Sequence, residues 1–363
     1  HGISSVNYKA LSTSPERPPF NRALRGQYPP GSTIKPFIGL AGLELKELQS
    51  RQKIDCPGYY MLKNDDRRYR DWKKEGHKHT DLNKAITESC DVFFYDLALT
   101  LGIDNMSSYL AHFGIGKKTG IDLRGELSGL NPSREWKRRN RSLPWFPGET
   151  LITGIGQGFM LTTPLQLANA TAAISMLGKR FKPQMVLGIQ DEQNGPIDKT
   201  IAKPLTPAPI NDEKNWLTVL AAMKNVVHGL HGTARGIKYN LKYTIAGKTG
   251  TTQNNSDGWF MGMVPNLVTG VWVGADDRAA HFRNTAYGQG ASMALPIWGL
   301  YMKSVEMMKP HWPSSRQSLP VSRKTGRLSL RQKTYVKNSN LRPQKQRQAT
   351  IKVAGLLLSG KAA

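Results

Sequence analysis

The sequence contains no long apolar run and few acidic residues, and it has only two cysteines. No stretch of 18 or more apolar residues occurs, which excludes a segment with the composition of a membrane-spanning helix, and no segment has the pattern of a signal peptide. With two cysteines, at most one disulfide can form within the chain. Hydrophobic residues make up 39% of the 363 positions, which is ordinary for a globular protein with a sizeable core.

The shortage of acidic residues is greatest at the C-terminal end. The chain has 51 Lys and Arg against 26 Asp and Glu, and residues 314–363 contain 12 of the basic residues and no acid. This composition, rich in Ser, Gln and Arg, predicts a disordered basic tail over residues 311–363, after a folded domain over residues 1–310. The tail is either an arm for anionic partners, such as lipid head groups or wall polymers, or a solvated appendage. No nucleic-acid partner is expected, because no basic stretch carries interleaved aromatic residues.

The first candidate catalytic segment is Ser32-Thr33-Ile34-Lys35, which follows Pro29-Pro30-Gly31. A serine just after such a break is favoured at a helix start, where Lys35 would lie one turn along on the same face. The helix dipole would favour negative charge at the Ser32 hydroxyl, and Lys35 would be its base. On its own, the pattern also fits a capped helix with a surface lysine.

A second candidate segment, Lys248-Thr249-Gly250-Thr251, ends a predicted strand over residues 243–252. Glycine weakens a strand unless something must approach its backbone, so Gly250 suggests a substrate lying along it. Lys248, Thr249 and Thr251 would then contact a substrate carboxylate, while the N–H groups of Thr251 and Ser32 would hold an oxyanion. Read alone, the segment is equally an ordinary polar turn.

A third segment, Ser89-Cys90-Asp91, lies between two predicted helical pieces within residues 82–95. Ser89 would relay a proton between Lys35 and an amine, and Asp91 would orient a lysine or the substrate amide. An isolated Ser-x-Asp is more often a polar turn between helices. Together, in this order, the three segments specify acyl transfer through a serine ester.

The set Ser-x-x-Lys, Ser-x-Asp and Lys-Thr-Gly resembles that of the penicillin-binding proteins and serine β-lactamases. The resemblance is closest to the elongation-type class B penicillin-binding proteins and covers roughly residues 1–305. It rests on further segments, among them His1-Gly2-Ile3-Ser4-Ser5, Asn21-Arg22-Ala23-Leu24, Asp71-Trp72, Gly76-His77, Thr119-Gly120-Ile121-Asp122-Leu123, Arg134-Glu135-Trp136-Lys137, Pro144-Trp145 and Gly154-Ile155-Gly156-Gln157-Gly158.

This resemblance implies a mixed α/β transpeptidase fold, with a five-stranded antiparallel sheet flanked by helices and an all-helical part beside it. It implies a peptidoglycan D,D-transpeptidase that cross-links stem peptides in cell-wall elongation and is acylated by β-lactams. It also implies an upstream anchor in the bacterial inner membrane, a non-catalytic pedestal, a catalytic domain in the periplasm and membrane partners from the elongation machinery. The alternatives are a β-lactam-hydrolysing relative and a non-catalytic β-lactam sensor.

The resemblance changes near Thr251. The segments from Thr252 to Gly274 and from Gly288 to Trp298 look more like the bifunctional class A enzymes, although no glycosyltransferase segment is present. The change leaves the predicted chemistry intact and puts the subfamily and its partners in doubt.

Two cysteines, one aspartate and one histidine form a candidate metal site: Cys56, Asp71, His77 and Cys90. Two thiolates, an imidazole and a carboxylate can complete a tetrahedral zinc sphere. The resemblance implies a structural zinc in some elongation-type enzymes, whose ligands match Asp71, His77 and Cys90 but have Asp where this chain has Cys56. A Cys56–Cys90 disulfide and two free thiols are the other interpretations.

Overall fold

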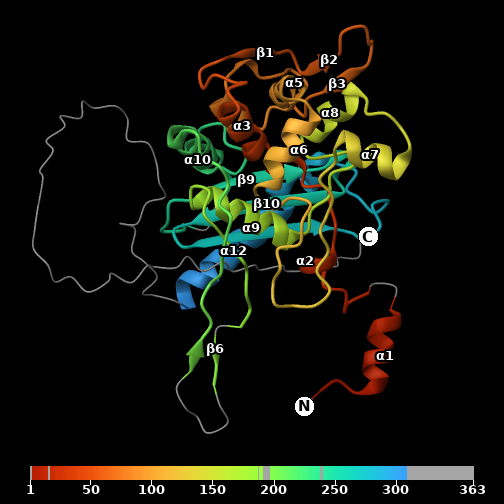
Figure 1. The fold of residues 1–363 in the computed structure, drawn as a ribbon, viewed down its shortest axis with the longest axis vertical. Coiled ribbons are helices and arrows are strands. Elements are labelled where there is room, and N and C mark those ends of the chain that lie inside the picture. The colour runs from red at the N-terminus through yellow and green to blue at the C-terminus, as the bar shows by residue number, and fades with distance from the viewer. Residues whose placement is uncertain (1, 15–16, 187, 191–196, 238–239, 309–363) are drawn as a thin grey trace, which may run out of the picture.

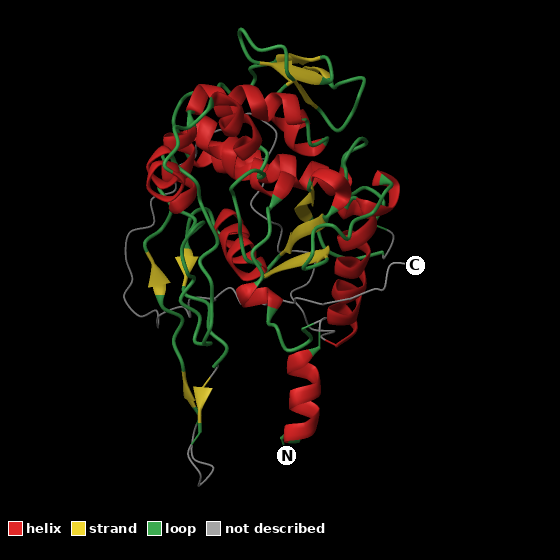
Figure 2. Cartoon of the chain, turned by 90° about the vertical axis from the view of Figure 1, so that its right-hand side faces the viewer, coloured by secondary structure: helices red, strands yellow, loops and turns green. Residues whose placement is uncertain are grey.

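The computed structural model describes residues 2–14, 17–186, 188–190, 197–237 and 240–308. The predicted basic tail lies outside these residues. In the described part, a layer of helices lies above an antiparallel sheet, and further helices cover the sheet (Figures 1 and 2). This is the mixed α/β arrangement that the sequence predicts.

The central sheet is built from three strands in the order β11–β10–β9. They are β9 (Ala246–Thr251), β10 (Asp257–Val264) and β11 (Leu267–Gly274), all paired antiparallel. The predicted strand over residues 243–252 is confirmed as β9, although β9 begins three residues later than the pattern of β-branched and aromatic residues suggests. A count of five strands is not confirmed within the described residues.

Helices pack on both faces of this sheet. Phe260 stacks edge-on against Trp298 of α12 (Gly290–Met308), with 5.1 Å between ring centroids. Gly270 faces the other way, where a Cβ atom would contact Ala168 of α9 (Pro164–Ser175). The helix α9 starts at the predicted Thr-Pro signal, with Thr163 Oγ1 accepting a hydrogen bond from Gln166 N.

The helical layer surrounds α3 (Lys35–Glu44), all of whose residues are buried. An apolar helix of this kind needs partners on every side, and α3 packs against α4 (Leu82–Thr87), α5 (Asp91–Leu101), α6 (Ile103–Ala111) and α10 (Glu213–His228). Both α4 and α5 confirm the predicted helical pieces on either side of Ser89, and α10 confirms a predicted amphipathic helix.

The remaining elements are short. The helices are α1 (Ser5–Thr13), α2 (Arg22–Arg25), η1 (Gly31–Ile34), α7 (Arg134–Arg141), α8 (Pro147–Gly154), η2 (Gln253–Asn255) and α11 (Thr285–Gly288). The strands pair as β1 (Ile54–Cys56) with β4 (Lys78–Thr80), β2 (Tyr59–Met61) with β3 (Arg68–Arg70), β5 (Arg180–Phe181) with β8 (Pro204–Leu205) and β6 (Gly188–Ile189) with β7 (Asp198–Lys199).

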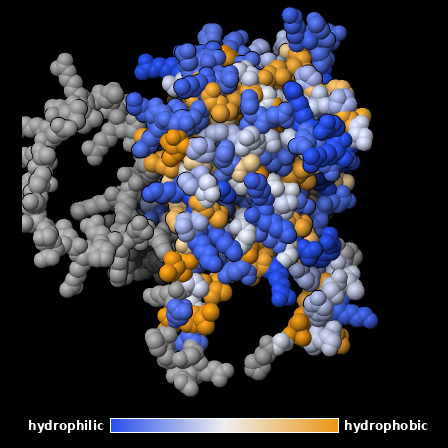
Figure 3. All heavy atoms as spheres, viewed as in Figure 1, coloured by the Kyte–Doolittle hydropathy of each residue, from blue (hydrophilic) through white to orange (hydrophobic). Residues whose placement is uncertain are grey.

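The surface is mostly hydrophilic on the face shown in Figure 3, with apolar side chains gathered towards its lower end. There, β6 and β7 form an arm that extends away from the sheet (Figure 1) and exposes Met185, Ile189 and Ile201. Within the described residues, no helix combines the length and the apolar character that crossing a bilayer requires.

The carboxylate of Glu44 joins the end of α3 to the start of α10. It is 2% exposed and accepts hydrogen bonds from Asn211 N at 2.5 Å, Asp212 N at 3.3 Å and Asn215 Nδ2 at 2.7 Å. Backbone N–H groups at a helix start have no partner within the helix, so this carboxylate satisfies donors that would otherwise be buried and unpaired.

Glu44→Ala should therefore lower the free energy of unfolding by about 2–4 kcal/mol, because it leaves several buried donors without an acceptor. The exposed Glu47→Ala, three residues away, should change it by less than about 0.5 kcal/mol. Denaturant unfolding of both variants and the wild type measures the difference. Equal stabilities of the two variants would show that Glu44 does not hold α10 in place.

Candidate active site

The backbone around Ser32 is held by close packing on two sides. Gly31 has φ of +54°, and a Cβ atom there would lie 2.9 Å from the carbonyl oxygen of Thr251 in β9. Its N–H donates to the carbonyl of Gly156 at 2.9 Å. Ser32 thus sits on the short helix η1, pressed between the end of the sheet and the segment after α8, rather than on the first turn of α3.

Gly250 has a different role from the one that its position suggests. A Cβ atom there would lie 2.8 Å from Thr33 Cγ2 and 2.9 Å from the carbonyl oxygen of Pro30. The close approach that requires glycine is therefore made by the chain's own η1, which packs directly on β9. A substrate lying along β9 stays a prediction, and Thr249 and Thr251 do line a cavity.

Lys35 points away from the surface and towards the turn that carries Ser89. Its Nζ donates to the Ser89 carbonyl at 2.8 Å and to Asp91 Oδ1 at 2.6 Å, and it lies 3.3 Å from Ser89 Oγ. The side chain is fully buried. Lys35 and Ser32 are adjacent along the helix start, as predicted, but the hydrogen bonds of Lys35 go to Ser89 and Asp91.

Lys248 reaches the same serine from the sheet. Its Nζ lies 2.9 Å from Ser89 Oγ and 3.1 Å from the Thr249 carbonyl, and its side chain is fully buried. Ser89 itself has φ of +61°, an uncommon conformation for a residue with a side chain. The left-handed turn places its hydroxyl between the two lysine amines, and so unites three segments that are far apart in the sequence.

Asp91 is fixed by a reciprocal pair of contacts with Asp71 and Trp72. Asp71 Oδ2 accepts hydrogen bonds from Asp91 N at 2.8 Å and Val92 N at 3.1 Å, which caps the start of α5. Trp72 N donates to Asp91 Oδ2 at 3.0 Å, and its indole Nε1 donates to the Ser89 carbonyl at 3.1 Å. The loop at residues 71–72 therefore holds the Ser89 turn in place.

The sequence does not predict a catalytic-site role for Trp72. Asp71-Trp72 is one of the segments of the family resemblance, but an Asp-Trp pair has no spacing that indicates a function. It also missed Thr233, whose hydroxyl lies 2.7 Å from that of Thr249 and which lines the same cavity. Thr233 follows α10, and only the fold brings it beside β9.

The pKa values of Lys248 and Asp91 are shifted in opposite directions. Burial, reinforced by the neighbouring Lys35 cation, holds the pKa of Lys248 well below its ordinary value, although Asp91 opposes this. Burial raises the pKa of Asp91, and Lys35 opposes that shift. The arrangement therefore favours the neutral form of the Lys248 amine.

The cavity beside these groups has a volume of about 520 Å³. The residues that line it include Ser32, Trp72, Ser89, Thr249 and Thr251. A hydroxyl with nearby amines at the base of a cavity is the arrangement that nucleophilic acyl transfer needs.

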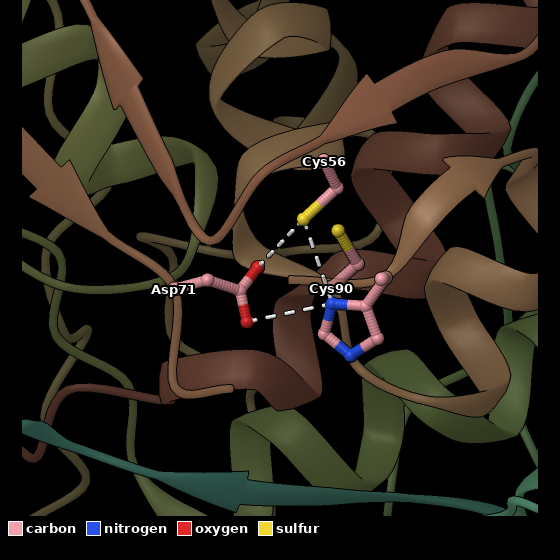
Figure 4. Close-up of side chains that lie close together, drawn as sticks. Cys56, Asp71 and Cys90 are labelled. Carbon is pink, nitrogen blue, oxygen red and sulfur yellow. Dashed lines mark hydrogen bonds and ion pairs between the residues drawn. The ribbon is translucent and has the colours of Figure 1, made fainter. Parts of the chain in front are cut away.

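Cys56, Asp71, His77 and Cys90 also come together as predicted. Figure 4 shows the side chains of Cys56 and Asp71 pointing towards one another, with Cys90 beside them. All four are buried, and one ligand atom from each lies within 4.8 Å of the others. Cys56 Sγ lies 3.6 Å from both Asp71 Oδ2 and His77 Nδ1. Both cysteines are free thiols, so the structure contains no Cys56–Cys90 disulfide.

The protonation of this cluster favours negative charge on sulfur. A hydrogen bond from Cys90, assisted by His77, lowers the pKa of Cys56 to about 5 although burial opposes it. Burial lowers the pKa of His77, but hydrogen bonds to Asp71 and Cys56 outweigh it and raise the pKa to about 9. The hydrogen bond to Cys56, together with burial, raises the pKa of Cys90.

A comparison with protein families identifies the chain. Residues 5–293 match the model described as the penicillin binding protein transpeptidase domain, which is most of the sequence. The chain belongs to the penicillin-binding protein transpeptidase family. The mixed α/β transpeptidase fold expected from the resemblance is confirmed.

Two curated penicillin-binding proteins are similar to it in sequence. The peptidoglycan D,D-transpeptidase MrdA of Haemophilus influenzae is 42% identical over 254 residues, 69% of this chain and 38% of the relative. Penicillin-binding protein 1A of Aquifex aeolicus is 31% identical over 303 residues, 80% of this chain and 35% of the relative. The chain therefore spans less than half the length of the curated relatives it matches.

Two solved structures are similar to it in fold. Pseudomonas aeruginosa PBP2 in complex with WCK 5153 is 38% identical with a TM-score of 0.72, covering 88% of this chain and 69% of that one. PBP2 of Helicobacter pylori in its complex with MreC is 28% identical with a TM-score of 0.68, covering 86% and 55%. These likenesses support the assignment to the elongation-type penicillin-binding proteins.

Lys248→Met should make the protein more stable, because it replaces a buried amine that has no carboxylate of its own by an apolar side chain of similar length. The lowered pKa means that, below its ordinary value of 10.5, the unfolded chain binds a proton that the native state does not. Wild-type stability thus falls as the pH falls from 10.5 towards the native pKa. The gain from Lys248→Met should be larger at pH 7 than at pH 10.

Thermal unfolding at both pH values measures this, with the exposed Lys214→Met of α10 as the matched control. The control should change stability little at either pH. A Lys248→Met variant that is less stable than the wild type at pH 7 would contradict the proposed cost of burying Lys248.

Proposed function

We propose that the chain is the catalytic domain of a peptidoglycan D,D-transpeptidase, with Ser32 as its nucleophile. The observation that carries the proposal is that Ser32 and Ser89 line one cavity, while the amines of Lys35 and Lys248 both lie within hydrogen-bond distance of Ser89 Oγ. The names of the relatives support the same activity, because the first matches are D,D-transpeptidases.

In this proposal, Ser32 Oγ attacks the carbonyl carbon between the last two D-alanines of a stem peptide. Lys35 receives the hydroxyl proton, which requires its amine to be neutral at that moment. The N–H groups of Ser32 and Thr251 hold the oxyanion of the tetrahedral intermediate. Lys248, Thr249 and Thr251 bind the terminal carboxylate, and the packing of η1 on Gly250 keeps these groups in register.

Ser89 carries the proton onward. Its hydroxyl lies between the amines of Lys35 and Lys248, so it can pass the proton to the leaving D-alanine amine when the carbon–nitrogen bond breaks. The amine of a second stem peptide then attacks the Ser32 ester, transfers its proton by the reverse route and releases Ser32. Asp91 holds Lys35 throughout through its 2.6 Å contact.

We propose further that this domain acts in cell-wall elongation, in the periplasm, on an anchor in the inner membrane that precedes it. The H. pylori PBP2 complex supports MreC-like membrane proteins of the elongation machinery as partners. The proposed ligands are stem peptides and β-lactams, since a β-lactam ring presents the same acyl group to Ser32.

Fluorescent penicillin should label the protein covalently at Ser32. Ser32→Ala should abolish labelling, and Lys35→Ala should slow it about 10²-fold or more, the usual effect of losing a general base. The exposed Ser304→Ala should label like the wild type. Intact-mass and peptide mapping measure the adduct, and an adduct on any other residue would refute the assignment of Ser32.

The lifetime of the same adduct separates the transpeptidase from the β-lactam-hydrolysing alternative. A slowly released acyl group is expected, because no further acid or base near Ser32 is assigned to activate water. Several turnovers per minute would favour the hydrolase.

We also propose that Cys56, Asp71, His77 and Cys90 hold a structural zinc ion. Ligand atoms around a tetrahedral zinc lie roughly 3.3–3.8 Å apart, given its usual bond lengths. The separations from Cys56 Sγ to Asp71 Oδ2 and to His77 Nδ1, both 3.6 Å, fall in this range, and the four ligand atoms together lie within 4.8 Å of one another. The low pKa of Cys56 supplies one thiolate, and zinc would deprotonate the second.

Protein purified without chelator should contain about one zinc per chain, and a chelator should lower its melting temperature, because a metal bound only by the native state stabilises it. His77→Ala should mimic the chelator and slow acylation of Ser32, while the exposed His281→Ala should not change the zinc content. Elemental analysis decides the matter. Less than about 0.2 zinc per chain, with a mass two hydrogens light, would indicate a Cys56–Cys90 disulfide instead.

A further inference from the structure

A buried carboxylate on the sheet, outside the catalytic segments, joins two walls of the cavity. Asp257 begins β10, and its side chain is 1% exposed. Its Oδ2 accepts hydrogen bonds from Thr252 Oγ1 at 2.6 Å and Arg278 Nη1 at 2.5 Å, and its Oδ1 accepts one from Trp272 Nε1 at 3.1 Å. A carboxylate this deeply buried is stable only with such partners.

The first wall is the turn between β9 and β10, called here the hairpin wall (residues 252–255). Thr252 N donates to the Asp257 carbonyl at 3.1 Å, and Asp257 N donates to Thr252 Oγ1 at 3.1 Å. Thr252 directly follows Thr251. Within this wall, Asn254 and Asn255 have φ of +61° and +56°, so the turn depends on these contacts to keep its shape.

The second wall is the loop after β11, called here the loop wall (residues 279–283). Its base is Arg278, whose carbonyl accepts a hydrogen bond from Ser256 Oγ at 3.3 Å. Asn255 Nδ2 donates to the Phe282 carbonyl at 3.1 Å, which joins the two walls directly. His281, Phe282 and Arg283 line the cavity, although each is largely exposed and has little packing of its own.

The base of the loop wall is also held from behind. Arg22 Nη2 lies 2.6 Å from Asp276 Oδ2, and Tyr28 OH donates to Asp276 Oδ1 at 3.4 Å. Asp276 and Arg278 lie two residues apart, just after β11, and each forms an ion pair. The two ion pairs thus fix where the loop leaves the sheet. Arg278 is the member tied to the hairpin wall, since its partner Asp257 also holds Thr252.

We propose that Asp257 and Arg278 are a positioning pair that sets the hairpin and loop walls, and so determines how tightly the cavity binds a ligand larger than a bare β-lactam nucleus. The inference rests on the proposed function, because acylation of Ser32 is its main readout. Neither residue contacts Ser32, Lys35 or Lys248, so the pair acts on binding before acylation and not on the chemical step.

Stopped-flow acylation separates the two steps, with benzylpenicillin and the side-chain-free 6-aminopenicillanic acid as probes. Arg278→Ala should raise the dissociation constant for benzylpenicillin by about tenfold or more and that for 6-aminopenicillanic acid by less than about threefold. The first-order acylation constants should stay within about threefold of the wild type. Arg278→Lys keeps the charge and should recover part of the lost affinity.

The matched control is Arg139→Ala, which removes an Arg–carboxylate pair that is exposed on both sides, with Glu135 on α7. It should leave both probes unaffected. Asp257→Asn, which keeps the shape of the side chain, should change binding in the same direction as Arg278→Ala. Equal losses for the two probes, or a loss confined to the acylation constant, would overturn the positioning role.

Hydrogen exchange distinguishes this inference from the proposed function. Arg278→Ala, but not Arg139→Ala, should speed exchange of the amides in the loop wall, whether or not penicillin reacts. A wild-type protein that neither penicillin acylates would refute the proposed function alone. Unchanged exchange in the Arg278→Ala loop wall would refute the positioning pair alone.

Discussion

The burial of two lysine amines against one serine hydroxyl and one carboxylate is the constraint on which the rest of the structure depends. Lys35 and Lys248 both reach Ser89 Oγ without solvent contact, and Asp91 forms the ion pair with Lys35. Buried charge is costly unless it is paired, so Lys248 is driven towards its neutral form. The proposed chemistry depends on this balance of charges, because Lys35 can accept the Ser32 proton only as a neutral amine. The rest of the fold must therefore stabilise this arrangement, because the burial of the two lysine amines is itself unfavourable.

The support comes from elements that do not themselves react. Asp71 caps α5 and fixes Asp91, Trp72 binds the Ser89 carbonyl, and Asp71 also belongs to the buried cluster with Cys56, His77 and Cys90. The proposed zinc site and the Ser89 turn thus share a residue, and Cys90 lies inside the Ser89 segment itself. On the opposite side, Asp257 organises the walls of the cavity in a comparable way. Both supports are buried carboxylates whose several acceptor contacts link segments distant in the sequence.

The sequence predicts the local parts of this site well and its connections poorly. The motif spacing predicts the helix start at Ser32, the turn at Ser89 and the strand at Lys248, because each depends on a few neighbouring residues. It also predicts that Cys56, Asp71, His77 and Cys90 form a cluster.

The sequence does not predict that Gly250 is required by the packing of η1, or that Trp72, Thr233 and Asp257 belong to the site. Those roles follow from contacts between remote segments, which only tertiary packing creates. The catalytic and metal-binding roles remain predictions, and the basic tail over residues 311–363 lies outside the described residues.

The most direct test of the account is a crystal structure of the protein after reaction with benzylpenicillin. The account predicts a covalent bond from Ser32 Oγ to the opened ring, with the carbonyl oxygen between the N–H groups of Ser32 and Thr251. It also predicts that Ser89 Oγ stays within hydrogen-bond distance of both lysine amines, and that the ligand carboxylate lies beside Thr249 and Thr251. A covalent bond at another residue, or an acylated Ser32 with Lys35 turned out into solvent, would contradict it.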